Sequence, residues 1–232
     1  MSTQVVHVAE PGFGPSWLTD FVRQWLESWH DALRIYARAN RRAEDPDIAH
    51  WWGERTSVGL LASAAWRLGR EDTVALTEYD VDRREGGEGQ ARCDLWIVRE
   101  GHTVSAEAKQ VWPAFSMNGD TGDSARVKEC LAWLKEARRD VRRILPKDQG
   151  ETGLAVCFVT PEMSRTALKT AAFEVFSERA TLFWHALEEE CRRLNNVAFA
   201  RYECAEDEYE AAMDKETDHV YPGVAVIVTR TW

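Results

Sequence analysis

Apolar residues recur along the chain at two different spacings. Over residues 16–42, and again over residues 47–68, they recur every three to four positions, which is the spacing of an amphipathic helix. Trp25 and Trp29 lie on the first apolar stripe, where we expect core packing, and Gly69 follows the second stripe. The pattern therefore predicts two helices before the first strand.

The rest of the chain mixes short β-type stretches with longer helical ones. Three consecutive stretches are rich in β-branched and apolar residues and are separated by turn residues, and a later run is almost entirely apolar, as in a strand buried on both faces. We predict strands over residues 73–83, 91–98, 102–109, 153–160, 197–203 and 223–231, and helices over 124–145 and 166–195. The fold class is thus α/β (α+β), a mixed β-sheet flanked by helices with an extra N-terminal helix.

Composition indicates the general class of the protein and the cellular compartment in which it works. A length of 232 residues suits one domain, and 44% hydrophobic with 29% charged residues is ordinary for a globular protein. No membrane span or signal-peptide pattern is visible. The five cysteines are odd in number and far apart, which favours reduced thiols over disulfides or a zinc site. We therefore expect a cytoplasmic protein without a membrane partner.

The net charge of -10 at first disfavours a nucleic-acid partner, because phosphate affinity comes from Lys and Arg. The charges are segregated, however. Residues 203–218 hold eight acids and one lysine, a local -7, whereas residues 126–147 hold eight bases and three acids, a local +5. The total therefore says little about the working surface, and the acidic segment is a candidate docking surface for a protein partner.

The chemistry centres on the hairpin predicted from the second and third strands. If Glu100 and Gly101 form a two-residue turn, the pairing register places Asp94 opposite Glu107. Glu107 and Lys109 share a face, because side chains in a strand alternate. Two neighbouring carboxylates repel each other unless a cation lies between them, and Mg²⁺ binds to such groups. A lysine beside them can stabilise charge that develops on phosphorus.

Further acids lie near this hairpin in the sequence. Glu54 shares the inward-facing stripe of the second predicted helix with Val58, so it needs a partner such as a metal ion or Lys109. On the first predicted strand three acids alternate and share one face, so one of them could join the site, although a solvated sheet face is the simpler interpretation. These acids are Glu78, Asp80 and Asp82.

This arrangement resembles the core of the PD-(D/E)xK nuclease superfamily, the restriction-endonuclease-like fold. The resemblance rests on a helix with Glu54, a strand with Asp94, and the Glu107-Ala108-Lys109 segment on the next strand, followed by a basic helix and another strand. It implies a divalent metal, Mg²⁺ or Mn²⁺, held by Asp94 and Glu107 and often assisted by Glu54. It also implies that Lys109 orients the water that attacks a phosphodiester.

The resemblance covers residues 47–160 and suggests how a single domain of residues 1–232 is organised. Residues 1–46 would form an N-terminal helical extension, 47–160 the nuclease-like core, and 161–232 a helix and strands that complete the domain. Cys93 stands where the signature has a proline, a common variation.

Candidate nucleic-acid contacts follow the catalytic segment. The basic helix carries two overlapping pairs of arginines four residues apart, which either contact phosphates or form a solvated face. Gln110 directly follows Lys109 and is a weak candidate for the glutamine of the exonuclease branch. The arginines are Arg138, Arg139, Arg142 and Arg143.

Three functional hypotheses stay open on the sequence alone. The leading one is a metal-dependent nuclease that acts in defence or repair, with DNA favoured over RNA and with a homodimer suited to duplex cleavage. The second is a catalytically silent restriction-like module that binds nucleic acid or protein in a larger assembly. The third is a hydrolase of small phosphoesters, disfavoured by the lack of a Gly-rich loop. The charged face of the hairpin is also compatible with a plain salt-bridge surface.

Overall fold

The computed structural model describes residues 5–9, 12–40, 43, 49, 53–69, 71–82, 90–114, 122–144, 151–164, 173–204, 213–214 and 219–231. Its main strands are β1 (Val5–Val8), β2 (Thr73–Asp82), β3 (Gln90–Arg99), β4 (His102–Val111), β5 (Thr152–Val159), β7 (Val197–Glu203) and β10 (Gly223–Arg230). They form one seven-stranded sheet in the order β1-β7-β10-β5-β4-β3-β2. Strands β4 and β5 are parallel, and the other neighbours are antiparallel, so the sheet is mixed.

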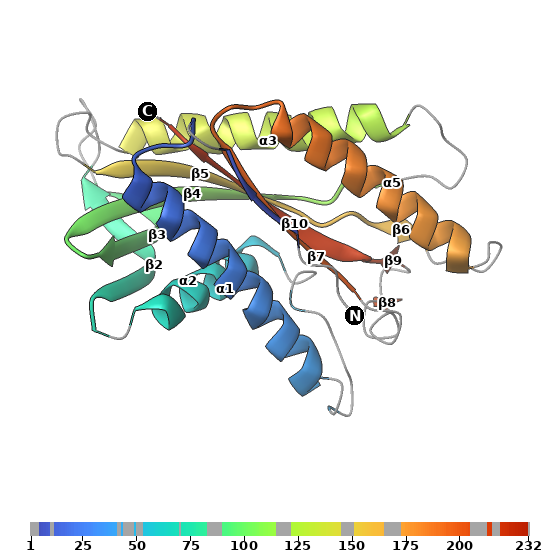
Figure 1. The fold of residues 1–232 in the computed structure, drawn as a ribbon, viewed down its shortest axis with the longest axis horizontal. Coiled ribbons are helices and arrows are strands. Elements are labelled where there is room, and N and C mark those ends of the chain that lie inside the picture. Colours follow the sequence, from blue (N-terminus) through green and yellow to red (C-terminus); the bar gives the residue numbers. More distant parts are fainter. Residues whose placement is uncertain are drawn as a thin grey trace.

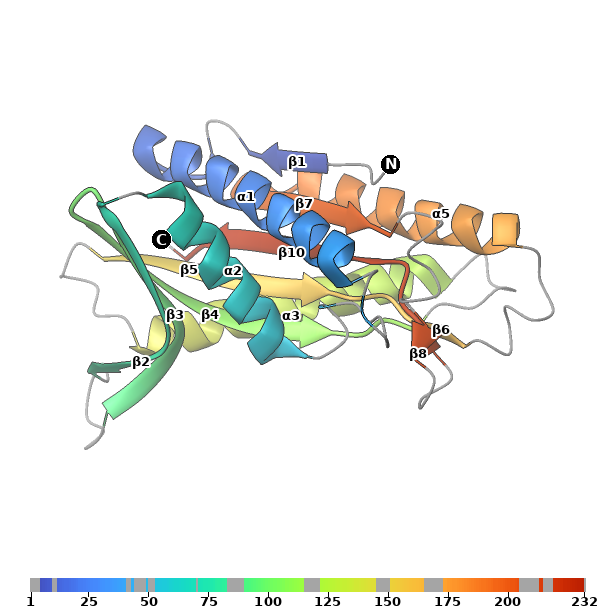
Figure 2. The same cartoon turned by 90° about the horizontal axis from the view of Figure 1, so that it is seen from below.

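Helices cover both faces of this sheet. They are α1 (Ser16–Asn40), α2 (Glu54–Leu68), α3 (Gly122–Ile144) and α5 (Phe173–Arg192). Helices α1 and α2 lie on one face, and α3 and α5 lie on the other (Figures 1 and 2). A second, small sheet joins β6 (Met163–Ser164), β9 (His219–Val220) and β8 (Met213–Asp214) in that order.

Two apolar layers form the core, one on each side of the main sheet. Trp25 and Trp29 of α1 are fully buried in the layer beneath α1 and α2, as their spacing predicts. Phe183 and Trp184 of α5 are buried in the layer beneath α3 and α5. Because helices cover both faces, every residue of β5 is buried, which confirms the predicted two-sided strand.

The observed elements differ from the predicted ones at the start of the second helix and in the short strands β1, β6, β8 and β9, which were not predicted. The second helix begins at Glu54 rather than at residue 47, because Gly53 has a φ of 106°, outside the helical region. Strand β1 was not predicted, since its four residues form a strand only by pairing with β7. Residues 166–172 of the last predicted helix lie outside the described residues.

The hairpin of β3 and β4 has the predicted register. Arg99 pairs with His102, and Glu100 and Gly101 have φ values of 50° and 78°, as a two-residue type I′ turn requires. The ladder continues as far as the pair of Leu95 and Ala106. Asp94 on β3 and Glu107 on β4 are the first residues beyond the end of this ladder.

Two further predictions concern the thiols and the membrane. All five cysteines are free and buried, which confirms unpaired core thiols. Burial raises the pKa of Cys93 and of Cys130 to about 12, so these thiols stay protonated at neutral pH. None of the helices in the described ranges is both long and apolar enough to cross a membrane.

Candidate metal and catalytic site

Glu78 on β2 and Asp94 on β3 lie where the regular alternation of side chains along this strand pair is interrupted. Leu95 belongs to the apolar layer beneath α1 and α2, whereas Cys93, two residues away, belongs to the layer beneath α3 and α5. In a regular strand these residues would share a face. Asp94 lies between them, and Glu78, with a φ of 52°, lies opposite in the register that pairs Thr77 with Leu95. Both carboxylates line the same pocket as a result.

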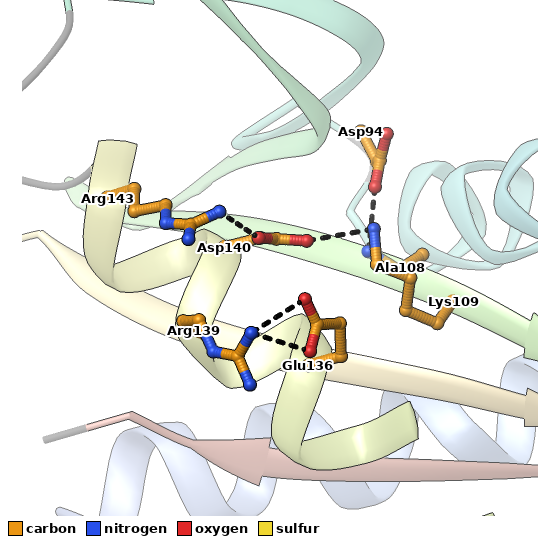
Figure 3. A network of polar contacts seen from close by, with 7 residues as sticks. All are labelled: Asp94, Ala108, Lys109, Glu136, Arg139, Asp140 and Arg143. Atoms are coloured by element: carbon orange, nitrogen blue, oxygen red, sulfur yellow. Dashed lines mark hydrogen bonds and ion pairs between the residues drawn. The ribbon is translucent and has the colours of Figure 1, made fainter. Parts of the chain in front are cut away.

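Asp94 is fixed by the backbone of the neighbouring strand. Its Oδ2 accepts a hydrogen bond from the Ala108 N–H at 2.7 Å (Figure 3). This contact takes the place of a ladder bond, since the pairing of β3 with β4 ends at Leu95. The predicted neighbours Asp94 and Glu107 are therefore brought together at the point where the two strands part.

Glu107 is the most buried carboxylate of the site. Its side chain is 8% exposed, and its Oε1 atom is buried without a hydrogen-bond partner. Burial first, and the charge of Asp94 second, raise the pKa of Glu107 to about 8, although Lys109 opposes the shift. A carboxyl that lacks water and faces another acid favours its neutral form. It would ionise readily if a cation were bound beside it.

Lys109 is held by an acid that the sequence analysis did not consider. Its Nζ lies 3.0 Å from the Oδ2 of Asp140 on α3, and Asp140 Oδ1 also contacts Arg143 at 3.2 Å (Figure 3). Burial alone lowers the pKa of Lys109, but Asp140 and the charges of Glu54 and Glu107 raise it overall. The ammonium therefore stays protonated beside the carboxylates.

Glu54 reaches the same cluster from α2. It begins the helix, where the dipole favours a negative charge, and Val58 of the same stripe is buried as predicted. Burial raises its pKa, and Asp94 adds to the shift, while Lys109 and the Gln110 backbone oppose it. Glu54 and Asp94 line a pocket of about 300 Å³ between α2 and the β2–β3 pair. The pocket gives the acids an opening to solvent.

Gln110 has a structural position. It is 7% exposed, accepts a hydrogen bond from Ser57 Oγ at 3.1 Å, and donates one to Thr160 Oγ1 at 3.3 Å. These bonds join α2 to β4 and to the end of β5. The amide is thus engaged within the protein, and a contact of Gln110 with nucleic acid stays a prediction.

The four arginines of α3 lie at its C-terminal end in differing environments. Arg139 and Arg143 are exposed and pair with acids one turn away, Glu136 and Asp140 (Figure 3). Arg142 donates to the Thr231 carbonyl at 3.2 Å. Arg138 is half-buried, and burial followed by the charge of Arg142 lowers its pKa.

Only part of the acidic segment 203–218 can be placed. Glu203 ends β7 and pairs with Arg201 at 2.7 Å, and Asp214 belongs to β8. Residues 205–212 and 215–218 lie outside the described residues, so the proposed docking surface there is not tested.

The carboxylates form a pair with a third acid nearby rather than a closed cage. Within the described ranges, no group of three His, Cys, Asp or Glu side chains is arranged to hold a metal ion. Mg²⁺ nevertheless binds through one or two carboxylates, with water and substrate phosphate completing the shell. The Oε1 of Glu107, buried without a hydrogen-bond partner next to Asp94, fits that requirement, because carboxylate oxygens are hard donors and the nearby Lys109 does not offset the raised pKa of Glu107.

Two residues at the site carried too little signal for sequence analysis. Asp140 stands among arginines in α3, where the helical pattern indicates a solvated pair. Arg55 follows Glu54 in α2 and lines the pocket, yet no motif marks it. In both cases the information lies in the packing of a helix against the sheet.

Comparisons with protein-family models, with curated proteins and with solved structures find no match. The functional conclusion therefore depends on the chemistry of these residues.

Proposed function

We propose that this protein is a metal-dependent nuclease with a restriction-endonuclease-like core, acting on DNA in preference to RNA. The observation that supports this most is the convergence of Glu54, Asp94, Glu107 and Lys109 from three elements, in the order that the PD-(D/E)xK signature requires. A raised carboxyl pKa and a half-buried, charged lysine in one cluster are typical of a catalytic centre.

Asp94 and Glu107 would hold the cation, with Glu54 as an accessory ligand. When bound, a divalent ion lowers the pKa of a water molecule and stabilises negative charge on a phosphoryl oxygen. The buried setting of Glu107 strengthens each of these interactions, since charges interact more strongly away from bulk water.

Two residues of the protein would position the attacking water and stabilise the charge that develops on the phosphate. Lys109, kept protonated by Asp140, stabilises the charge that develops on the phosphate. Glu54 on the pocket wall orients the attacking water, and its raised pKa improves it as a base near neutral pH. The water oxygen bonds to phosphorus as the water gives a proton to the Glu54 carboxylate, the bond from phosphorus to the leaving sugar oxygen breaks, and that oxygen takes up a proton from solvent.

A cleavage assay on several substrates tests the proposal. We expect the wild type to cut supercoiled plasmid, single-stranded DNA or RNA in Mg²⁺ or Mn²⁺ but not in EDTA, with DNA cut fastest. Asp94→Asn should lose at least 100-fold in rate, whereas Asp31→Asn, an exposed acid of an ion pair on α1, should cut as the wild type does. Failure of the wild type to cut any substrate with either metal would refute the proposal.

One observation favours the silent-module alternative. In the structure Lys109 is paired with Asp140 at 3.0 Å and Asp94 is bonded to the Ala108 backbone, so both groups have partners within the protein. Titration of Mn²⁺ into the metal-free protein separates the two functions. A catalytic site binds the ion and loses affinity 10- to 100-fold in Asp94→Asn. A purely structural face gives equal, weak binding in both proteins.

A further inference from the structure

The pocket beside Asp94 is flanked by two arginines that share one acid. Its lining residues are Glu54, Arg55, Val58, Thr77, Glu78 and Asp94. Glu78 Oε1 lies 3.2 Å from Arg55 Nε, and Glu78 Oε2 lies 2.6 Å from Arg92 Nη1. One carboxylate on β2 thus bridges a guanidinium from α2 and another from β3 at the pocket edge.

Stability does not account for this bridge. The side chains of Arg55 and Arg92 are 90% and 61% exposed, and ion pairs this open to solvent contribute little to folding. The backbone of Glu78 also has a φ of 52°, a left-handed conformation that residues other than glycine rarely adopt. A strained residue with two exposed cations beside a candidate active site suggests a functional role.

The chemistry of the bridge matches a phosphate. A guanidinium presents a planar fork of N–H donors that suits carboxylate and phosphate oxygens alike. Glu78 therefore occupies, with its two oxygens, the position that a phosphate between the same arginines would take. Asp80 lies directly across from Arg92 in the pairing of β2 with β3, and its Oδ1 lies 3.7 Å from Arg92 Nε, where it supports the guanidinium.

We propose that Arg55 and Arg92 form a phosphate subsite for the nucleic-acid backbone, and that Glu78 fills this subsite when substrate is absent. The inference rests on the proposed function and adds the side from which the strand enters. A backbone phosphate displaces the Glu78 carboxylate, and the next phosphate along the strand reaches Asp94 and Glu54 across the pocket. The nucleic acid then approaches over α2 and β2 rather than over the arginines of α3.

The excess of acids at this pocket makes the subsite dependent on a cation. Three acids and one arginine line the pocket, Glu54, Glu78 and Asp94 with Arg55, and the pair of Arg92 and Asp80 lies beside Glu78. A bound divalent ion reduces the repulsion of an approaching phosphate. Binding of DNA should therefore be tighter in Mg²⁺ than in EDTA at equal ionic strength.

Equilibrium binding of a fluorescent duplex oligonucleotide tests the subsite without relying on cleavage. All variants carry Lys109→Met, so the duplex stays intact in Mg²⁺. We expect Arg55→Ala and Arg92→Ala each to weaken binding at least fivefold and to lower the salt dependence by about one counterion. Glu78→Gln should tighten binding at least threefold, because a neutral amide competes less well for the arginines.

Arg34→Ala is the matched control, since Arg34 is an exposed arginine paired with Asp31 at 3.2 Å on α1. Circular dichroism verifies the fold of each variant. The subsite is wrong if Arg55→Ala and Arg92→Ala bind as Arg34→Ala does, if Glu78→Gln weakens binding, or if no protein binds the duplex. Cleavage by the wild type with unchanged binding in the arginine variants would refute the subsite alone. Altered binding without cleavage would refute the nuclease and retain the subsite.

Discussion

The buried carboxyl of Glu107 couples the stability of the fold to pH. Its pKa is about 8 in the folded protein and 4.5 as its ordinary value, so the folded state holds the proton over a range where the unfolded chain has released it. Stability from this group is therefore present below pH 4.5 and is lost as the pH rises through 8. Removing the charge should stabilise the metal-free protein at alkaline pH.

We expect Glu107→Gln to raise the free energy of unfolding at pH 9 in EDTA by up to roughly 5 kcal/mol, since a pKa of about 8 in place of 4.5 corresponds to about 1.4 kcal/mol for each pKa unit. The gain should shrink toward pH 5. Urea unfolding at both pH values measures it. A Glu107→Gln protein that is equally or less stable than the wild type at pH 9 would show that the carboxyl already has a partner in the folded state.

His30 couples stability to acid in the opposite direction. It is 3% exposed beside the ring of Tyr202, neither ring nitrogen has a hydrogen-bond partner, and burial lowers its pKa below 6.5. The unfolded chain thus takes up the proton first, and stability falls as the pH drops below 6.5. His30→Phe should reduce the difference in urea midpoint between pH 7 and pH 5. An unchanged difference would assign the acid sensitivity to other groups.

Asp140 tests whether Lys109 depends on its partner. If the ion pair positions the ammonium, Asp140→Ala should slow DNA cleavage about tenfold while the affinity for DNA changes little. The control is Glu136→Ala, which removes the same kind of surface pair with Arg139 one turn earlier on α3. Equal rates for both variants would mean that Lys109 finds its position without Asp140.

The proposed catalytic residues could be related to one another from the sequence because they are local. Asp94, Glu107 and Lys109 lie on one hairpin, so a two-residue turn and the alternation of strands suffice to relate them. Asp140 and Arg55 reach the site through the docking of α3 and α2 on the sheet. That docking depends on the whole core, which no local pattern encodes.

At the scale of elements, the position of α2 depends on a buried polar link. Gln110 joins Ser57 of α2 to Thr160 after β5, and Glu54 lies one turn before Ser57. Gln110→Leu leaves two hydroxyls without this partner. We expect a loss of about 1–3 kcal/mol in the free energy of unfolding, together with slower cleavage because Glu54 is no longer held against the hairpin.

Ser57→Ala separates the two contributions to this effect. It removes one bond and keeps the contact of Gln110 with Thr160, so its losses should be smaller than those of Gln110→Leu. Thermal unfolding and initial cleavage rates measure both. A Gln110→Leu protein that matches the wild type in both assays would show that α2 is positioned by apolar packing alone.

The elements themselves were largely predictable. The apolar periodicity of α1 and the uniform burial of β5 follow from composition that is repeated along each segment. The prediction missed strand β1, which depends on pairing with the distant strand β7. It also placed the start of α2 too early, because that start depends on the conformation of Gly53. Such features depend on a single residue or on a long-range contact, and a repeated local pattern does not reveal either.

At the scale of the whole molecule, the strand order escaped prediction. The sheet places β10 between β7 and β5, so the last long strand is an interior strand rather than an edge strand. This arrangement buries β10 almost completely and joins the first and last parts of the chain through β1, β7 and β10. Sequence patterns limit which segments are strands, but pairing between distant strands is decided by the assembled core.

A double-mutant cycle of cleavage rates tests most directly whether the site acts as one catalytic centre. Plasmid cleavage in Mg²⁺ is measured for the wild type, Asp94→Asn, Lys109→Met and the double variant, with Arg126→Ala on α3 as control. We predict that each single variant loses at least 100-fold, that the double variant is little worse than either, and that the control is unchanged, because residues of one centre are non-additive. Rates in Asp94→Asn and Lys109→Met equal to that of Arg126→Ala would contradict the account.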